Sequence, residues 1–272
     1  MLPPAILLHR SKVDFQSDVI RLLTHTIYPP VSDESRETNV SGSTAVTFHD
    51  QLASTWEDRY KTRQFSVRLQ VLSELLPESQ KGKRWLDAGC GTGTLSRWLA
   101  NERGASVTAL DASEQMLANA QGTLGVEYLR GDLTRCGLPD SSIDGILCSS
   151  VLEYLADVSA ALKEFHRVLR PGGIVLASIP NAALSVRIPL RLGYWMTRWM
   201  GQRRLFSFLD HSRHVFTTNG FAQLLRENGF EPEVIRDFGK IRLPIGVDLP
   251  IASSLLMGRF TSIRSAHESR VG

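Results

Sequence analysis

The sequence predicts an α/β fold: a doubly wound, mostly parallel sheet with helices before it and a lid insert late in the chain. Short apolar segments alternate with helical patterns between residues 84 and 179. Strict succession of strand and helix is typical of a parallel sheet covered by helices on both faces. A glycine-rich turn joins the first strand to the helix that follows it. With 272 residues, 42% hydrophobic and 22% charged, the chain is long enough for one elaborated globular domain.

Helices are expected before the sheet. Residues 1–45 are predicted to form an N-terminal extension, partly flexible because much of it is polar, and residues 46–272 to form the main domain. Large apolar residues recur every four positions at Phe48, Leu52 and Trp56. A second apolar helical pattern follows and stops at Pro77. Two helices are therefore predicted to precede the first strand.

The sheet itself is predicted from apolar segments of strand length. Strands are expected at residues 84–88, 107–111, 126–130, 143–149 and 174–179. The helices between them are expected at residues 95–101, 114–122 and 158–169. The last part of the chain adds a helix at 219–228, an extended run at 231–237 and a hydrophobic stretch between 241 and 257.

Composition argues against several classes of protein. A net charge of +3 is small against 31 basic and 28 acidic side chains, so bulk charge gives no reason to expect a nucleic-acid binder. The three cysteines are odd in number and lack CxxC spacing, which argues against a disulfide framework and a metal site. The apolar start is too short for a signal sequence, and no stretch reaches the roughly 18 apolar residues of a membrane span. A cytoplasmic protein is expected.

The glycine-rich turn at residues 89–93 is the most informative segment. Glycines let the backbone approach a ligand where a Cβ would collide, and the helix that follows offers unpaired N–H groups. The turn is therefore expected to hold a cofactor. Its order is GxGxG, with Thr94 where the GxGxxG loops of dinucleotide-binding proteins have a third glycine. This weakens a dinucleotide interpretation and leaves it open.

Three acids are expected at the same edge of the sheet as this turn. Asp111 ends the second strand, about twenty residues beyond the turn, where a carboxylate can accept hydrogen bonds from both ribose hydroxyls of a nucleoside. Asp132 follows the third strand and is predicted to take the adenine amine, and Asp87 directly precedes the turn. Such acids repel a pyrophosphate and favour a sulfonium and an ammonium group. A cationic nucleoside is expected.

Five motifs, in the right order, closely resemble those of the class I S-adenosylmethionine-dependent methyltransferases. They lie at residues 86–93, at 107–113 with Met116, at 131–133, at 143–155 and at 169–173. The resemblance covers about residues 48–237 and is greatest to small-molecule enzymes of the ubiquinone-type O-methyltransferase group. It implies a Rossmann-like methyltransferase fold with seven strands, S-adenosyl-L-methionine as cofactor, and methyl transfer to a hydroxyl of a moderately hydrophobic small molecule.

The resemblance also implies site residues. Those expected to bind the cofactor are Asp87, Gly89, Cys90, Gly91, Gly93, Asp111, Ala112, Met116, Asp132, Leu133 and Ser149. The candidates for a general base are His211 and His214, and Tyr154 is expected to contact the substrate. Where related enzymes commonly have Glu-His after the fourth strand, this sequence has Glu153 and Tyr154, so no metal or base role tied to that histidine is carried over.

The segment at residues 182–216 is too long for a passive connection. It contains six arginines and one aspartate, interleaved with large apolar residues. At helical spacing, one apolar stripe is formed by Leu192, Trp195, Met196, Trp199 and Met200. A lid whose Trp195 and Trp199 bind the substrate is the favoured interpretation. Peripheral membrane contact through residues 187–208 and a homodimer contact are the alternatives.

Other functional classes stay open from the sequence alone. Methylation at nitrogen or carbon of a small molecule or lipid is one, and a catalytically silent, cofactor-binding partner subunit is another. An NAD-dependent oxidoreductase is disfavoured by the missing third glycine and by the acids around the turn.

Overall fold

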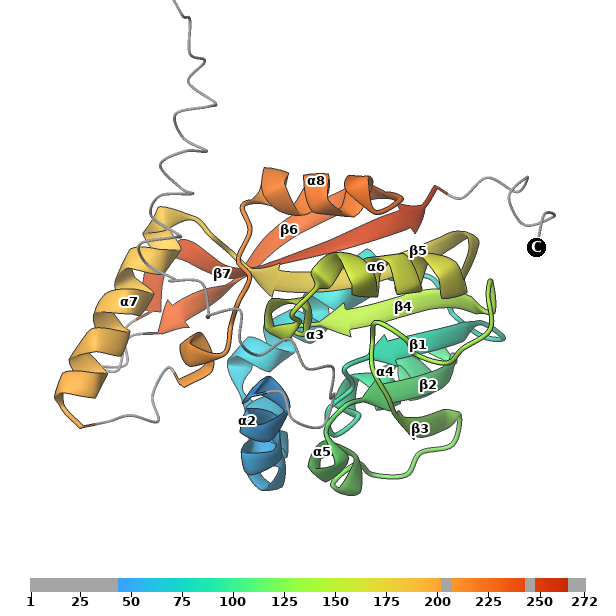
Figure 1. The fold of residues 1–272 in the computed structure, drawn as a ribbon, viewed down its shortest axis with the longest axis horizontal. Helices are drawn as coiled ribbons and strands as arrows, with labels where there is room; N and C mark the ends of the chain where they lie inside the picture. The colour runs from blue at the N-terminus through green and yellow to red at the C-terminus, as the bar shows by residue number, and fades with distance from the viewer. Residues whose placement is uncertain (1–43, 202–206, 243–247, 264–272) are drawn as a thin grey trace, which may run out of the picture. The chain divides into compact units, whose positions relative to one another are not determined.

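The computed structural model describes residues 44–201, 207–242 and 248–263 (Figure 1). By their contacts, residues 40–272 belong to one unit. The N-terminal extension predicted over residues 1–45 lies outside the described residues, apart from its last two.

Seven strands form one sheet in the order β3-β2-β1-β4-β5-β7-β6. Their bounds are Arg84–Ala88 (β1), Ser106–Asp111 (β2), Val126–Arg130 (β3), Ile143–Ser149 (β4), Leu169–Pro180 (β5), Phe230–Arg242 (β6) and Asp248–Ser262 (β7). The first five strands run parallel, and β7 is antiparallel to both β5 and β6. The predicted mostly parallel, seven-stranded sheet is confirmed, and β1, β3 and β4 have the predicted bounds.

The strand order reverses at β1, which lies between β2 and β4. Asp87 of β1 is paired in register with Ala109 of β2 on one side and with Leu147 of β4 on the other. In open α/β sheets, a crevice for ligands forms outside the carboxyl ends of the strands where the order reverses. The topology therefore places the ligand site beyond Ala88, where the glycine turn begins.

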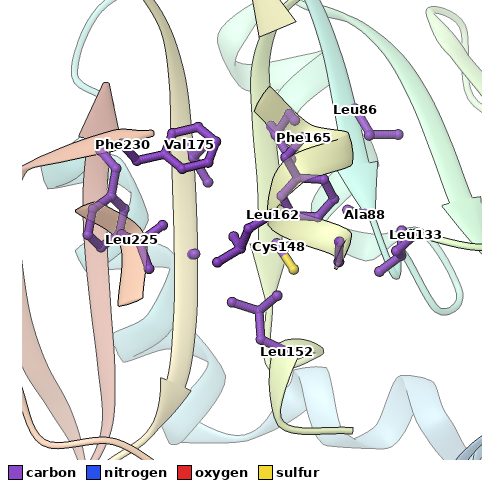
Figure 2. Packing of buried hydrophobic residues seen from close by; sticks show 14 of the residues in the cluster. Leu86, Ala88, Leu133, Cys148, Leu152, Leu162, Phe165, Val175, Leu225 and Phe230 are labelled. Carbon is purple, nitrogen blue, oxygen red and sulfur yellow. The ribbon is translucent and has the colours of Figure 1, made fainter. Parts of the chain in front are cut away.

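Helices cover both faces of the sheet, each over its own hydrophobic core. On one face lie α6 (Val158–Val168) and α8 (Thr218–Glu227), and on the other lie α3 (Arg63–Leu75) and α4 (Thr94–Arg103). Figure 2 shows Leu162 and Phe165 of α6 directed into the first core. Both side chains are fully buried, and burial of each contributes about 1.5–3 kcal/mol. The doubly wound arrangement follows from these two amphipathic pairs.

Polar side chains set where several helices begin. The hydroxyl of Ser113 accepts a 3.0 Å hydrogen bond from the backbone N–H of Met116 at the start of α5 (Glu114–Ala118). Asp157 caps α6 in the same way through the N–H of Ala160 at 2.9 Å. Such caps satisfy N–H groups that have no partner within the helix. Helix α5 ends four residues before its predicted end, because Asn119 leaves helical geometry and its amide bonds the Gln115 carbonyl.

Two irregular regions flank this framework. Before the sheet, α2 (Thr44–Leu52) runs into the 3-10 helix η3 (Ala53–Lys61) and then into α3, so the predicted helical entry is confirmed. Between β5 and α8, the segment predicted as an insert contains α7 (Leu184–Trp199) and the short η5 (Ser207–Asp210). Among the helices in the described ranges, none is both long and apolar enough to cross a bilayer.

Candidate active site

A cavity of about 900 Å³ lies at the carboxyl ends of the central strands. Its wall includes residues that directly follow β1, β2, β3 and β4, together with residues of α2, η3, α3 and α7. The volume lies within the range of about 300–1,000 Å³ that is common for ligand sites. The cavity is therefore where the topology predicts it.

The glycine turn after β1 folds back against the end of β2. The backbone N–H groups of Gly89 and Cys90 both donate to the Leu110 carbonyl, at 2.8 and 3.1 Å. Gly91 has a φ of 56°, and a Cβ there would lie 3.2 Å from Nε1 of Trp56, on the opposite wall. Glycine is required at this position by both the backbone conformation and the close approach.

Gly93 has a different role from the one expected. It has a φ of 78° and precedes the first residue of α4, but it is absent from the cavity wall. A Cβ on Gly93 would lie 2.3 Å from the hydroxyl of Tyr128, on β3. In the structure, Gly93 shapes the entry into α4 and does not face the cavity.

The three predicted acids meet at the cavity. Asp87 is 2% exposed and accepts a 2.6 Å hydrogen bond from the Ser96 hydroxyl. Burial, opposed by the hydrogen bond from Ser96 and assisted by the nearby Asp111, raises the pKa of Asp87 to about 7. Burial also raises the pKa of Asp111, although the Ser113 and Gly91 N–H groups oppose this by donating to its carboxylate. Asp132 accepts from the backbone N–H of Thr134 at 2.8 Å.

Most of the residues predicted to bind the cofactor share this one cavity. They are Asp87, Gly89, Cys90, Gly91, Asp111, Ala112, Met116, Asp132, Leu133 and Ser149. They come from the carboxyl ends of β1, β2 and β4 and from the segments that follow β1, β2 and β3, which the parallel sheet brings to one edge. Their contact with the cofactor stays a prediction.

The helices before the sheet form the opposite wall. The indole N–H of Trp56 donates to the Tyr60 hydroxyl at 2.8 Å, and both side chains line the cavity. Glu57 is tied to α4, since it accepts from the Thr94 hydroxyl at 3.2 Å and pairs with Arg97 at 3.2 Å. At the other edge, the Ser113 hydroxyl donates to Asp50. These tethers hold the helical wall over the glycine turn.

His49 on α2 lines the cavity, and the sequence analysis did not identify it. Its Nδ1 lies 2.7 Å from the Ala45 carbonyl, and burial lowers its pKa. Because a carbonyl only accepts, Nδ1 carries the proton and Nε2 of the neutral ring presents a lone pair. The ring lies edge-on to Tyr154, with the centroids 4.8 Å apart. The sequence around His49 showed only an amphipathic helix, so no local signal marked the residue.

The two histidines predicted as general bases lie elsewhere. The ring of His211 stacks on Phe48 with centroids 4.3 Å apart, and Nε2 of His214 donates to the Leu155 carbonyl at 2.9 Å. Neither belongs to the cavity wall, whereas Tyr154 does. His49 is the histidine on the cavity wall, while the base role of His211 and His214, which flank the wall residues Ser212 and Arg213, stays a prediction.

Four arginines line the cavity: Arg59, Arg68, Arg187 and Arg213. Arg68 on α3 donates to the Ser149 hydroxyl at 3.3 Å, and burial lowers its pKa. Arg59 stacks over the Trp56 ring at 4.4 Å. The guanidinium groups come from η3, α3, α7 and the segment before α8. No regular spacing in the sequence indicates that these four segments meet at one cavity.

Beside the arginines, the wall holds polar atoms without hydrogen-bond partners. Glu153 is 3% exposed, and burial raises its pKa to about 8. Its Oε2 and the hydroxyls of Ser150 and Ser212 are buried and have no hydrogen-bond partner. Buried polar atoms without partners are costly, so a ligand that bonds them would gain affinity. Within the described ranges, no three His, Cys, Asp or Glu side chains form a metal site.

The predicted aromatic roof is not formed. Trp195 is 62% exposed and Trp199 is 90% exposed, and neither belongs to the cavity wall. Helix α7 contributes Arg187 and Leu190 to the wall instead. The apolar stripe is present on α7, but it faces solvent, because the side of the helix that carries Arg187 and Leu190 is the one turned to the cavity.

Comparisons with known proteins agree with this geometry. Residues 86–177 match the family model described as a methyltransferase domain. A malonyl-[acyl-carrier protein] O-methyltransferase from Serratia marcescens is 46% identical over 132 residues, which are 48% of this chain and 50% of that protein. The protein of the same name from Pectobacterium atrosepticum is 35% identical over 157 residues, 57% of this chain and 59% of that one. The chain spans about half the length of these curated relatives.

Solved structures extend the likeness beyond that region. An S-adenosylmethionine-dependent methyltransferase from Mesorhizobium loti is 27% identical, covers 70% of this chain and 95% of its own, and has a TM-score of 0.51. A methyltransferase from Thermotoga maritima, 23% identical, covers 79% of this chain and 99% of its own with a TM-score of 0.59, which supports the fold. The order of the strands, the glycine turn, the three acids and the comparisons all agree with one another. Residues 86–177 therefore carry a methyltransferase domain, in a fold shared with S-adenosylmethionine-dependent methyltransferases.

Proposed function

We propose that this chain transfers the methyl group of S-adenosyl-L-methionine to a carboxylate oxygen of an acceptor bound in the same cavity. The observation that carries the proposal is that four arginines and the glycine turn line one cavity. A guanidinium can bind a carboxylate through two parallel, charge-assisted hydrogen bonds. The four arginines therefore favour an anionic acceptor over a neutral one.

The relatives support an acid as acceptor. Their names describe O-methylation of a malonyl group on an acyl carrier protein, and a malonyl group attached through one end has a free carboxylate at the other. The resemblance seen in the sequence implied a different methyl acceptor, a hydroxyl of a moderately hydrophobic small molecule. The four arginines of the cavity wall and the relatives' names both favour replacing that acceptor with a carboxylate.

The wall that carries the three acids fits the cofactor. In this proposal Asp111 accepts from the ribose hydroxyls and Asp132 from the adenine amine. Both line the cavity, and the buried Asp87 favours a positively charged group nearby. The glycine turn leaves room for backbone approach. When bound, S-adenosyl-L-methionine supplies a methyl carbon that accepts an electron pair from the acceptor oxygen as the carbon–sulfur bond breaks.

The remaining wall residues position the acceptor. Arg68 and the other arginines of the wall orient the carboxylate, and the protonated Glu153 can donate one hydrogen bond to it. A carboxylate is already unprotonated at neutral pH, so its methylation needs no general base. In this proposal neither His211 nor His214, which are not among the residues of the cavity wall, acts as a base.

A hydroxyl acceptor is the second candidate, and His49 is the observation that favours it. A hydroxyl must lose its proton as the oxygen–carbon bond forms, and Nε2 of the neutral His49 ring can accept it. The two candidates therefore differ in their need for His49.

The products distinguish the candidates directly. The protein is incubated with the methyl donor and either malonyl-acyl carrier protein or a catechol, and the acceptor is followed by mass spectrometry. A carboxylate acceptor gains one CH₂ unit in mass as a methyl ester, and mild alkali hydrolyses this ester, together with the thioester to the carrier protein, and releases methanol. A hydroxyl acceptor forms a methyl ether, which resists alkali. Ether formation without ester formation would overturn the carboxylate proposal, and so would the absence of transfer to malonyl-acyl carrier protein.

Variants assign the roles of the wall residues. Arg68→Gln and Arg187→Gln are expected to lower kcat/KM for the acid at least about tenfold, because each removes a charge-assisted contact. Arg226→Gln is the control, since Arg226 is exposed and pairs with Glu231. His49→Gln should leave ester formation nearly unchanged. A large loss of ester formation in His49→Gln would contradict a mechanism without a base.

A further inference from the structure

The outer face of α7 exposes a continuous apolar stripe that the cavity does not use. Its side chains and their exposed fractions are Ile188 (55%), Leu192 (60%), Trp195 (62%), Met196 (62%), Trp199 (90%) and Met200 (63%). Spacings of three and four residues place them on one side of the helix. Helix α7 contacts β7 and lines the cavity through its other side. Large exposed apolar patches mark interaction surfaces.

The same region concentrates positive charge. Residues 182–216 contain six arginines against the single acid Asp210, whereas the whole chain has a net charge of only +3. Within α7, Arg191 and Arg198 lie at the border of the stripe, and the helix has no acidic residue. Arg198 pairs with Asp210 at 2.9 Å and lies 4.8 Å from the Tyr194 ring. The stripe is thus bordered by arginines. Without residues 182–216, the rest of the chain has slightly more acidic than basic side chains.

We propose that α7 docks flat on an anionic membrane surface, with the apolar stripe at the acyl boundary and the arginines against the headgroups. An amphipathic helix of this kind binds such a surface by burying apolar area and attracting anionic lipid, and tryptophan is favoured at that depth. Trp199 is the most exposed residue of the stripe. Arg191 and Arg198, at the border of the stripe, are complementary in charge to the headgroups.

A fluid lipid surface fits this helix better than a folded partner does. Six long side chains on a convex helix need a matching groove in a folded protein, while acyl chains adapt to them without one. A second copy docking by the same face would bring the two arginine borders together, which costs energy because the charges are alike. Docking on lipid instead places the wall residues Arg187 and Leu190 within about one helix diameter, ~10 Å, of the headgroups.

Co-sedimentation of the full chain with vesicles tests the proposal. The protein should sediment with vesicles of phosphatidylglycerol and phosphatidylcholine, bind vesicles of phosphatidylcholine alone much less, and lose binding as salt rises. Trp195→Ser combined with Trp199→Ser should weaken binding at least about tenfold. Met196→Lys and the pair Arg191→Glu, Arg198→Glu should weaken it as well. Thermal melting establishes that each variant is folded.

Matched changes outside α7 serve as controls. Leu124→Ser removes an apolar side chain that is 97% exposed, and Arg130→Glu reverses an exposed arginine that pairs with Glu114. Both should leave vesicle binding unchanged. Failure of the unaltered protein to sediment with anionic vesicles at low salt would overturn the proposal. If the protein does not bind vesicles, two other results would identify a different partner for α7. A dimer that Trp195→Ser with Trp199→Ser dissociates would identify a second copy of the chain. An acidic protein that Arg191→Glu with Arg198→Glu releases would identify that protein.

Discussion

The carboxylate of Asp111 accepts a 2.7 Å hydrogen bond from the backbone N–H of Gly91, which joins the end of β2 to the glycine turn after β1. The other oxygen of Asp111 accepts from the N–H of Ser113 at 2.8 Å. A carboxylate has about four acceptor positions, so lone pairs remain for a ligand. One side chain therefore holds two loops in place and also presents acceptors to the cavity that both loops line.

Replacing Asp111 tests this double role. Asp111→Ala should weaken binding of S-adenosylmethionine by about 1.5–3 kcal/mol, the usual contribution of a hydrogen bond to a charged group. Asp111→Asn, which keeps one acceptor, should fall between this variant and the unaltered protein. Calorimetry with the cofactor and with its demethylated product gives both affinities. Unchanged affinity in Asp111→Ala, measured beside the exposed control Asp237→Asn, would contradict the assignment.

Gly91→Val should abolish cofactor binding in a folded protein. The new side chain would be strained at a φ of 56° and would fill the space between the turn and Trp56. Gly137→Val is a matched control, because Gly137 has a φ of 74° and no atom lies within 4 Å of its would-be Cβ. Both variants carry backbone strain, but only Gly91→Val should lose affinity. Circular dichroism and a binding assay are run together, and equal affinities would refute the close approach.

Binding of the cationic cofactor should release a proton from Asp87. Burial and Asp111 hold the pKa of Asp87 near 7, so near pH 6.5 much of this acid is neutral. A positive charge nearby favours the ionised form, lowers the pKa and expels the proton. Affinity should therefore rise between pH 6 and pH 7.5. Calorimetry at pH 6.5 in two buffers of different ionisation enthalpy measures the released protons, and Asp87→Asn should release none.

Glu153 should make the fold less stable in mild alkali. Burial raises its pKa from 4.5 to about 8, so the folded protein keeps this acid neutral while the unfolded chain ionises it. The contribution of the neutral Glu153 to the free energy of unfolding is fully present below about pH 4.5 and is lost as the pH rises through 8. Glu153→Gln keeps a neutral polar group of similar shape. Between pH 6 and pH 9 its melting temperature should fall less than that of the unaltered protein, and an equal fall would show that Glu153 is already ionised in the fold.

The framework and the cofactor wall could be predicted from the sequence because both depend on local order. Apolar segments of strand length alternate with helical patterns, and parallel strands joined in this way have their carboxyl ends at one edge. Asp87 and Asp111 lie at the carboxyl ends of two such strands and Asp132 follows a third, so their meeting in one cavity follows from the topology. The need for a residue without a Cβ at Gly91 was likewise expected from the turn, and its positive φ was found only in the structure.

The acceptor side of the cavity depended on tertiary contacts between distant segments. His49, Arg68 and Arg187 lie on three different helices, and each reaches the cavity only because of how its helix crosses the sheet edge. The contact of Arg68 with Ser149 joins residues 81 positions apart. Helical periodicity shows that one face of a helix differs from the other, but it does not show which strand end the helix covers.

The stripe on α7 separates the two kinds of information most clearly. The spacing of Trp195 and Trp199 was enough to place both on one side of a helix. An apolar face is favourable against a cavity, a lipid surface or a second protein alike, because burial of apolar area has no direction of its own. Only the packing of α7 beside β7, with Arg187 and Leu190 turned to the cavity, decided that the tryptophans face outward.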